Sequence, residues 1–597
     1  MFLLRRIGRD LGTTLCLAAL LTATHTQTQA QTPSADPPKM QLPADQRAFQ
    51  AARAIVDPEP RLAAMREFVT TYPKSTRVSR AQIEILNVLL KNFPQRTPEI
   101  DAQARLLMKT SGKGLSKLYF EADIADSLAD AGTHGADLPL AEKYANDAVN
   151  KLTEAGFDKD ITDADKKYKQ PRSTPASMHS RYATTRASAL SALARVDLDE
   201  NKIPQATTLL DEAYGLSPTA NEVNLLRGEI ALDGHRDPEA LAYFERAQLT
   251  GELKSPWREK MMALYRKEHA GSDAGFTAEM DTRYAQLFPE PFTPKKHESA
   301  NGSRTVLLEL FTGSACEPCV SADLAVDALL QAYPRQELVA LSFDQHVPEP
   351  DPLANPDSVA RGTLYTIAGT PTFTLDGQKL PMGGGSREDS EEAYSAVSKR
   401  IDTEASAFSG VQLKLNAERS ADGLVHAKAS VTVTDPQQMQ QQLASKHEAS
   451  PADNEASASK PSTPPPAIAA PPPPPVEPHL VVNFALVEDD VRYSGENGMR
   501  FHRMVVRSLA QPADGGFEVG PGKDLDATFD AAQITSKLKE YLDGYELKND
   551  RFGKVEFLSK DTTIHPAHMA VAAWVQDTTT HRVLQAAFVP LGQEPQP

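Results

Sequence analysis

The segment LFTGSACEPCVSAD, residues 310–323, contains a Cys-X-X-Cys pair, Cys316 and Cys319, where one sequence pattern ends and another begins. The residues RTVLLELF (304–311) form a short apolar run typical of a buried parallel strand. From Cys319 onward, CVSADLAVDALLQAY repeats apolar side chains at helical spacing. We therefore expect the pair at a helix N-terminus, where unpaired N–H groups favour a thiolate. Cys316 should be the exposed, more reactive thiol, and Cys319 should be shielded.

The pattern of alternating strands and helices continues beyond the cysteine pair. LVALSF (338–343) predicts a second strand, and GTPTFTLDGQKL (369–380) predicts a third strand with a tight Asp-Gly turn into a fourth. SREDSEEAYSAVSKRID (386–402) predicts a closing helix. Residues 300–405 are therefore expected to form one α/β domain.

The Cys-X-X-Cys pair combined with Thr370-Pro371 resembles the thioredoxin superfamily. The resemblance implies that Cys316 is the nucleophile, that Cys319 is the resolving thiol, and that Pro371 is a cis proline facing them. Thr370 and Glu317 are the residues expected to border a substrate. No cofactor is expected.

The segment also departs from the superfamily pattern near the pair. Ala315 stands where an aromatic residue is common, and Leu310 stands where a polar or acidic residue is common. Glu309 is one residue away from that position and is a weaker candidate for proton transfer. Glu317 places a carboxylate between the cysteines, which disfavours a thiolate. The reduction potential of the Cys316–Cys319 pair therefore cannot be inferred from the thioredoxin superfamily.

Three chemical roles for the pair are compatible with the sequence. It can be a redox site, a structural disulfide, or part of a copper or zinc site completed by a histidine. His346 follows the second expected strand, and His565 and His568 form an HPAH motif. A metal role for these histidines is the least favoured of the three, and no resident metal ion is predicted.

The N-terminus has the features of a secretory signal peptide over residues 1–30, followed by a flexible leader over 31–45. Removing residues 1–30 removes Arg5, Arg6, Arg9 and Asp10, which changes the formal charge from −17 to −17 − 2 = −19. The third cysteine, Cys16, lies in the removed segment. An acidic exported chain is a poor candidate for binding nucleic acid. We expect a periplasmic or outer-membrane-associated protein, in a compartment where a disulfide persists.

Residues 46–290 have the pattern of helical repeats with a period of 34 residues. PQATTLLDEAYGLSPT and PEALAYFERAQLTG align so that Ala206, Leu210 and Ala213 match Ala240, Phe244 and Ala247. The pattern resembles the tetratricopeptide repeat, with degenerate copies at 140–152 and 66–76 and a solvated insertion at 153–180. A generic helical bundle is the alternative. Such repeats form surfaces for peptide or protein ligands.

Residues 408–593 alternate apolar and polar side chains, which predicts an all-β sandwich. A proline-rich segment, 436–478, is expected to be a disordered insertion within it. The alternative is a linker before a separate last domain. The sequences VLLELFTGSACEPC, PTFTLDG and LVEDDV together resemble a bacterial cell-envelope family related to certain outer-membrane lipoproteins, over residues 300–590. That family has no settled activity to transfer.

The sequence thus predicts a multidomain chain: an all-α repeat region, an α/β thioredoxin-like domain and an all-β sandwich. Two functions follow from different classes. The first is an exported thiol–disulfide oxidoreductase that acts on cell-envelope protein thiols or disulfides, with the repeats binding partners. The second is a non-catalytic interaction scaffold. Neither requires a transmembrane segment in the mature chain.

Overall fold

The computed structural model describes residues 43–110, 115–129, 138–168, 174–297, 304–444, 478–547 and 555–592. The predicted signal peptide, most of the leader and residues 445–477 of the proline-rich segment lie outside these ranges. Within the described ranges, no helix is both long and apolar enough to cross a membrane. The chain divides into two compact units, the first comprising residues 1–151, 195–202 and 549–554 and the second the remainder. This division falls inside the helical region, whereas the sequence predicts a boundary near residue 300.

The first unit is helical. Consecutive helices pack against each other and bury apolar side chains that recur at helical spacing, such as Leu62, Met65 and Phe68. Its helices are α1 (Ala44–Arg53), α2 (Pro58–Thr71), α3 (Val78–Asn92), α4 (Thr97–Thr110), α5 (Leu115–Ala129) and α6 (Leu138–Lys151). The first helix includes Ala44 and Asp45, so it overlaps the last two residues of the predicted leader.

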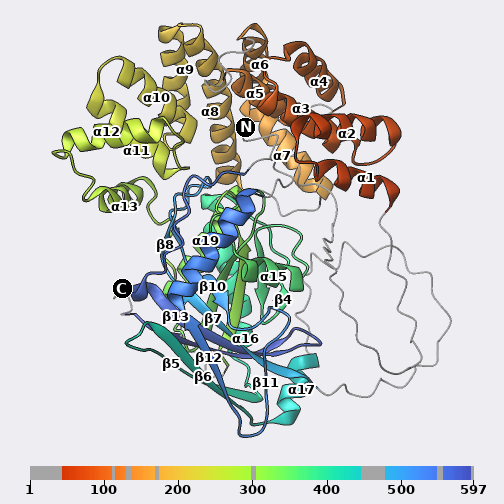
Figure 1. Cartoon of the computed structure of the whole chain (residues 1–597), viewed down its shortest axis with the longest axis vertical. Coiled ribbons are helices and arrows are strands. Elements are labelled where there is room, and N and C mark those ends of the chain that lie inside the picture. Colours follow the sequence, from red (N-terminus) through yellow and green to blue (C-terminus); the bar gives the residue numbers. More distant parts are fainter. Residues whose placement is uncertain are drawn as a thin grey trace. The chain divides into compact units, whose positions relative to one another are not determined.

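The second unit begins with further helices, shown in Figure 1. They are α7 (Glu154–Tyr168), α8 (Pro175–Asp199, up to Ala194 in this unit), α9 (Ile203–Leu216), α10 (Asn221–Asp233), α11 (Asp237–Leu249), α12 (Trp257–Glu268) and α13 (Phe276–Leu287). All six side chains used to align the repeats are fully buried. The expected solvated insertion at 153–180 is wrong, because α7 buries Phe157 and Ile161. Those apolar residues lie four apart and form one helical face.

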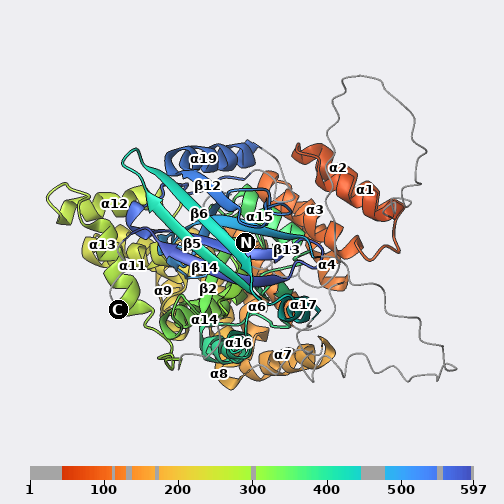
Figure 2. The same cartoon turned by 90° about the horizontal axis from the view of Figure 1, so that it is seen from below.

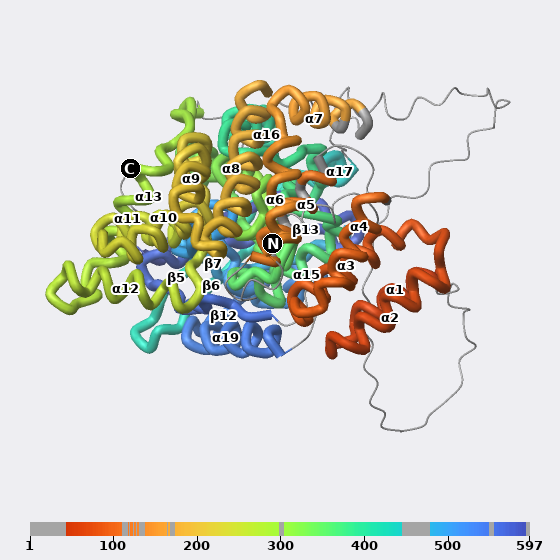
Figure 3. The backbone as a smooth tube through the Cα atoms, turned by 90° about the horizontal axis from the view of Figure 1, so that it is seen from above, coloured from red at the N-terminus to blue at the C-terminus, as the bar shows by residue number. Residues whose placement is uncertain are grey.

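A glycine allows α10 and α11 to pack closely side by side (Figure 3). A Cβ atom on Gly228 of α10 would lie 2.5 Å from Cε1 of Phe244 on α11. Phe244 is completely buried and cannot move into solvent. The helix pair therefore requires a residue without a side chain at this contact.

The α/β segment has the expected element order. Its strands are β1 (Val306–Thr312), β2 (Leu338–Asp344), β3 (Thr372–Leu375) and β4 (Gln378–Lys379), and its helices are α14 (Val320–Ala332), α15 (Pro356–Leu364) and α16 (Ser390–Ala405). β1 lies between β2, which is parallel to it, and β3, which is antiparallel. Both faces of β1 are buried, which explains its continuous apolar run.

The C-terminal strands extend the same sheet, so the prediction of a separate all-β domain is wrong in this respect. The strand order is β14-β13-β7-β10-β2-β1-β3-β4, with β11 paired to β7. The added strands are β7 (Leu480–Glu488), β10 (Val505–Leu509), β11 (Phe517–Glu518), β13 (Met569–Asp577) and β14 (Val583–Pro590). Pairing with β10 covers the edge of β2, where unpaired backbone groups would otherwise be exposed.

A smaller second sheet packs against these C-terminal strands and encloses a second apolar core. It contains β5 (Val411–Arg419), β6 (Leu424–Val433) and β12 (Asp524–Asp530), which lie side by side in Figure 2. A two-stranded hairpin is made by β8 (Val491–Arg492) and β9 (Phe501–His502). Two facing sheets are thus present, but one of them is shared with the α/β segment.

Two helices interrupt the region predicted as β structure. The first, α17 (Pro436–Ala444), occupies the start of the predicted disordered insertion and buries Met439 and Gln442. The second, α19 (Ala531–Leu547), buries Ile534, Leu538 and Leu542. The spacing of four residues in α19 is a helical signal that is present in the sequence.

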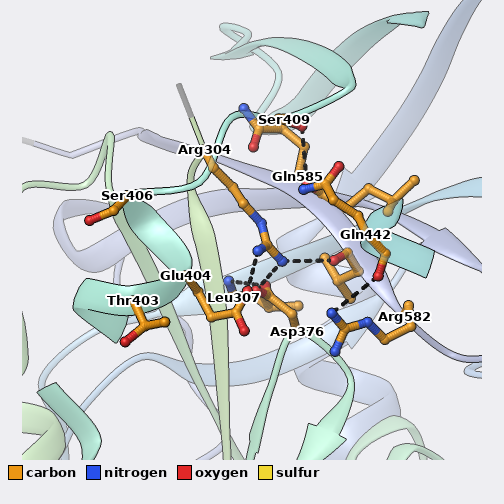
Figure 4. Close-up of polar contacts among 12 residues, drawn as sticks. Arg304, Leu307, Asp376, Thr403, Glu404, Ser406, Ser409, Gln442, Arg582 and Gln585 are labelled. Atoms are coloured by element: carbon orange, nitrogen blue, oxygen red, sulfur yellow. Dashed lines mark hydrogen bonds and ion pairs between the residues drawn. The ribbon is translucent and has the colours of Figure 1, made fainter. Parts of the chain in front are cut away.

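A buried polar network joins the α/β segment to the C-terminal strands (Figure 4). The Arg304 guanidinium, before β1, pairs with Asp376 in the β3–β4 turn and with Glu404 at the end of α16. Asp376 also accepts a hydrogen bond from the Leu307 N–H at 2.9 Å. Gln585 of β14 accepts one from the Thr305 N–H at 2.9 Å. Loss of Arg304 would leave the completely buried Asp376 carboxylate without its cation, at a typical cost of about 3–5 kcal/mol.

We predict that Gly228→Ala lowers the melting temperature of the second unit. The added methyl group would meet two Phe244 ring atoms at 2.5 and 2.6 Å; overpacking typically costs about 1–3 kcal/mol, and we expect so close an overlap with a buried ring to outweigh the gain of about 1 kcal/mol in helix propensity. Gly215→Ala in α9 is the matched control, because nothing lies within 4 Å of its added Cβ. Thermal unfolding followed by circular dichroism should show a decrease for the first variant and no decrease for the second. Equal melting temperatures for both variants would contradict the close packing of α10 on α11.

Candidate redox site

The cysteine pair is a disulfide at the end of β1 and the start of a helical segment. Cys316 and Cys319 are bonded with a Cα–Cα distance of 5.2 Å. A short 3₁₀ turn, Glu317–Cys319, leads directly into α14. The expected location at a helix N-terminus is confirmed. The expected exposure of Cys316 is wrong, because both cysteines are 0% exposed.

Thr370 and Pro371 face this disulfide from the chain segment before β3. The Thr370–Pro371 peptide bond is cis, as the resemblance implies. The Thr370 hydroxyl lies 3.3 Å from Sγ of Cys316 and 3.1 Å from the carbonyl oxygen of Val347. The predicted residues Cys316, Cys319, Thr370 and Pro371 therefore lie together in one site. Glu317 lies in the cysteine turn and is partly exposed, and its role with a substrate stays a prediction.

The loop of the β8–β9 hairpin, residues 493–500, contacts the chain next to the disulfide. The Asn497 N–H donates to the carbonyl oxygen of Ser314 at 3.1 Å. The Asn497 side-chain amide lies 3.4 Å from the carbonyl oxygens of Gly313 and Cys316. The hairpin loop is therefore bonded to the backbone on the N-terminal side of the disulfide.

A second loop, residues 381–386, contacts the cysteine turn at Pro318 and the start of α14 at Ser321. The Gly385 N–H donates to the carbonyl oxygen of Pro318 at 2.9 Å, and the Ser321 N–H donates to the carbonyl oxygen of Gly385 at 3.2 Å. A Cβ atom on Gly384 would lie 2.2 Å from the Pro318 carbonyl oxygen. The glycine-rich sequence of this loop permits that close approach to the cysteine turn.

Glu309 does not serve the disulfide. Its carboxylate accepts a hydrogen bond from Nε of Arg361 at 2.7 Å and another from the Thr374 hydroxyl at 3.0 Å. Both charged side chains are completely buried. Glu309 is thus one partner of a buried ion pair with Arg361.

Three carboxyl groups that the sequence analysis did not single out lie behind the disulfide: Asp323, Asp344 and Asp351. Asp323 on α14 accepts a hydrogen bond from the Thr312 hydroxyl at 2.9 Å. Asp351 accepts one from the Ser314 N–H at 2.5 Å. For Asp344, at the end of β2, neither carboxyl oxygen has a hydrogen-bond partner among the described residues.

Burial raises the pKa of each of these carboxyl groups. It raises the pKa of Asp323 to about 7, with Asp351 adding repulsion and the Thr312 hydroxyl opposing the rise. Burial raises the pKa of Asp351 to about 6, although backbone N–H donors oppose it. The pKa of Asp344 is raised well above its usual range by burial and then by Asp351 and Asp323. The three groups therefore carry less than their full negative charge near neutral pH.

His346 lies in the loop next to this carboxyl cluster. Its Nδ1 accepts a hydrogen bond from the Asp351 N–H at 2.9 Å, and its Nε2 lies 2.9 Å from the Tyr541 hydroxyl. Its ring stacks on Tyr545 with centroids 4.0 Å apart. Both nitrogens are thus used in hydrogen bonds. Among the residues that the structure describes, no three His, Cys, Asp or Glu side chains are grouped to hold a metal ion, so His565 and His568 form no such group there.

Comparisons with known proteins add little to this geometry. No protein-family model matches the chain. No curated protein matches it. Among solved structures, a domain of the outer membrane lipoprotein Omp28 from Porphyromonas gingivalis is similar over 31% of this chain and 89% of its own length, with 14% sequence identity and a TM-score of 0.15. A similarity of this size carries no argument about function.

We predict that Asp344→Asn stabilises the protein more at pH 8 than at pH 5. The folded state holds the Asp344 proton to a higher pH than the unfolded state does, so the free energy of unfolding falls as pH rises above about 4. An asparagine side chain does not titrate, so the free energy of unfolding of the variant does not fall in this way as the pH rises. The exposed Asp514→Asn is the control. Melting temperatures of the wild type and the variants at both pH values test this. A difference in melting temperature between Asp344→Asn and the wild type that is the same at pH 5 and pH 8 would contradict it.

Proposed function

We propose that this chain is an exported thiol–disulfide oxidoreductase and that Cys316 and Cys319 are its redox pair. The observation that carries the proposal is the arrangement of a disulfide at a helix N-terminus facing the cis Thr370–Pro371 bond. This arrangement supports a thioredoxin-like role. The Thr370 hydroxyl lies 3.3 Å from the Cys316 sulfur, and under this proposal the backbone at the cis bond pairs with an extended substrate peptide once the site is open.

The proposed chemistry is reversible thiol–disulfide exchange. In the reducing direction, the Cys316 thiolate attacks a substrate disulfide, and one substrate sulfur leaves as a thiolate. The Cys319 thiolate then attacks Sγ of Cys316, which re-forms the Cys316–Cys319 bond and releases the second substrate sulfur. Two electrons pass to the substrate, and the leaving thiolates take up protons. The oxidising direction is the reverse.

Asp323 is the group proposed to exchange the proton of Cys319. The two residues are four apart where the 3₁₀ turn continues into α14, so their side chains share one helical face. Because the pKa of Asp323 is raised to about 7, both of its protonation states are available near neutral pH. Cys319 must lose a proton before it attacks, and a buried acid–base group can accept that proton.

Protein thiols or disulfides of the cell envelope are the proposed substrates, and the helical repeats are the proposed partner-binding region. The location rests on the predicted signal peptide. A structural disulfide in an interaction scaffold is the second candidate, and the complete burial of both cysteines favours it. A metal-binding role through the pair is a minor third candidate.

Trapping a partner with Cys319→Ser tests the proposed function. Attack by Cys316 still occurs in this variant, but the mixed disulfide cannot resolve. We expect Cys319→Ser to accumulate disulfide-linked partners from an envelope extract, detected by non-reducing electrophoresis. Cys316→Ser is the matched control and should trap none. An absence of trapped partners from both variants would favour the scaffold.

Asp323→Asn should slow the resolution of a preformed mixed disulfide with a model peptide. Asparagine cannot accept the Cys319 proton, and general base catalysis typically contributes about 10²–10⁴-fold. The rate of mixed-disulfide resolution by the wild-type protein should rise as the pH passes through about 7, whereas the rate of the variant should show no such rise near pH 7. Quench-flow measurement of peptide release between pH 5 and 9 provides the profile. An unchanged rate and an unchanged profile would remove Asp323 from the mechanism.

A further inference from the structure

The burial of the disulfide is not explained by its own turn. Ala315, Glu317 and Pro318 are all partly exposed, whereas Cys316 and Cys319 between and beside them are completely buried. The turn therefore lies near the protein surface. Other chain segments pack on this turn, and the hairpin loop 493–500 contacts the carbonyl oxygens of Ser314 and Cys316 through Asn497.

The hairpin loop has a sequence suited to this close contact. A Cβ atom on Gly495 would lie 2.6 Å from the Ser314 carbonyl oxygen, so only glycine fits there. Gly498 has a φ of 80°, in the region that favours glycine. The Asn497 side chain also accepts a hydrogen bond from the Met499 N–H at 2.9 Å, which shapes the loop tip. The tip is thus built to present Asn497 to the cysteine turn.

Helix α13 holds this loop at both of its ends. One carboxylate, Asp281, pairs with Nε of Arg492 at 2.9 Å and with Nε of Arg500 at 2.8 Å. These two arginines flank the loop tip. The Tyr284 hydroxyl, one turn further along α13, donates to the Gly498 carbonyl oxygen at 3.2 Å. The helical region therefore fixes the hairpin through these polar contacts and through the Phe501 ring, which packs edge-on against Tyr284 with centroids 5.6 Å apart.

The contacts on the two sides of the loop differ in kind. Toward the disulfide, the loop makes a few backbone and amide hydrogen bonds. Toward α13, it makes two ion pairs with Asp281, in which the Arg492 side chain is 41% exposed and the Arg500 side chain is only 9% exposed. Partly exposed ion pairs are weakened by salt, whereas buried packing is not. The solvent-facing Arg492–Asp281 pair is consequently the part of this attachment that salt or a competing charged group weakens most.

We propose that loop 493–500 is a displaceable strap that closes the Cys316–Cys319 site, and that Asp281 on α13 holds the strap closed. Opening it uncovers Cys316 for an incoming thiol, and any partner that competes for Asp281 opens it. The biological use of the strap rests on the proposed function. The closure itself is a property of the fold and is measurable without a physiological substrate.

The test is the rate at which dithiothreitol reduces the disulfide in the folded protein. Dithiothreitol supplies two electrons and is oxidised to its cyclic disulfide, while Cys316 and Cys319 become thiols. Samples are quenched with an alkylating reagent and counted by mass spectrometry. Asp281→Asn and Asn497→Ala should each increase the rate about fivefold or more, which corresponds to the loss of about 1 kcal/mol of closure.

Asp273→Asn is the matched control, because Asp273 forms an exposed ion pair with Arg266 in the same helical region and does not contact the loop. Its reduction rate should equal that of the wild type. High salt should accelerate reduction of the wild type and leave Asp281→Asn nearly unchanged, because salt screens the pairs that the variant lacks. Melting curves of all three variants exclude unfolding as the cause of faster reduction.

Equal reduction rates for wild type, Asp281→Asn and Asn497→Ala would overturn the strap. Faster reduction in both variants would support it, whether or not Cys319→Ser traps a partner. The two proposals can therefore fail separately. If the strap is found but no partner is trapped, the oxidoreductase function fails and the closure stands.

Discussion

The continuous sheet is the constraint on which the rest of the second unit depends. The α/β strands and the C-terminal strands share one hydrogen-bonded sheet because β10 covers the edge of β2. The buried Arg304 guanidinium pairs with Asp376 and Glu404, which ties the start of β1 to the β3–β4 turn and to the end of α16. Gly377 permits the β3–β4 turn to reach the β13–β14 turn, because a Cβ there would lie 1.9 Å from the His581 carbonyl oxygen.

This shared sheet has a direct consequence for the disulfide. The β8–β9 hairpin immediately precedes β10, and the Met504 carbonyl oxygen accepts a hydrogen bond from the Ser342 N–H of β2 at 2.8 Å. Docking of β10 therefore holds the base of the hairpin near the strands that lead to the cysteine turn. A C-terminal domain folded separately would not provide this anchor. The closed site is thus a product of sheet architecture together with the polar contacts of α13.

The sequence predicted local features well where they depend on neighbouring residues. The strand before Cys316, the helix after Cys319, the cis Thr370–Pro371 bond and the buried repeat positions such as Ala247 are all present. The strand, the helix and the buried repeat positions follow from spacing and residue type, whereas the cis bond is what the resemblance to the thioredoxin superfamily implies. The α19 helix was missed although Ile534, Leu538 and Leu542 carry its signal, because strand patterns on both sides dominated the prediction.

The burial of the cysteines could not be predicted from the same patterns. Asn497 lies 181 residues after Cys316, and an alternation of apolar and polar residues does not specify which distant loop reaches which turn. The raised pKa of Asp323 likewise depends on burial and on Asp351, which comes from another loop. Long-range contacts of this kind arise from the register of the shared sheet, which local sequence does not encode.

The most direct test of the account is the equilibrium between the oxidised and reduced forms of Cys316–Cys319 in glutathione buffers of graded potential, with folding followed in parallel. A redox site predicts reversible reduction to the dithiol while the circular dichroism spectrum stays native. It also predicts the same midpoint from either direction. A disulfide that remains oxidised until the protein unfolds would contradict the account and identify the pair as structural.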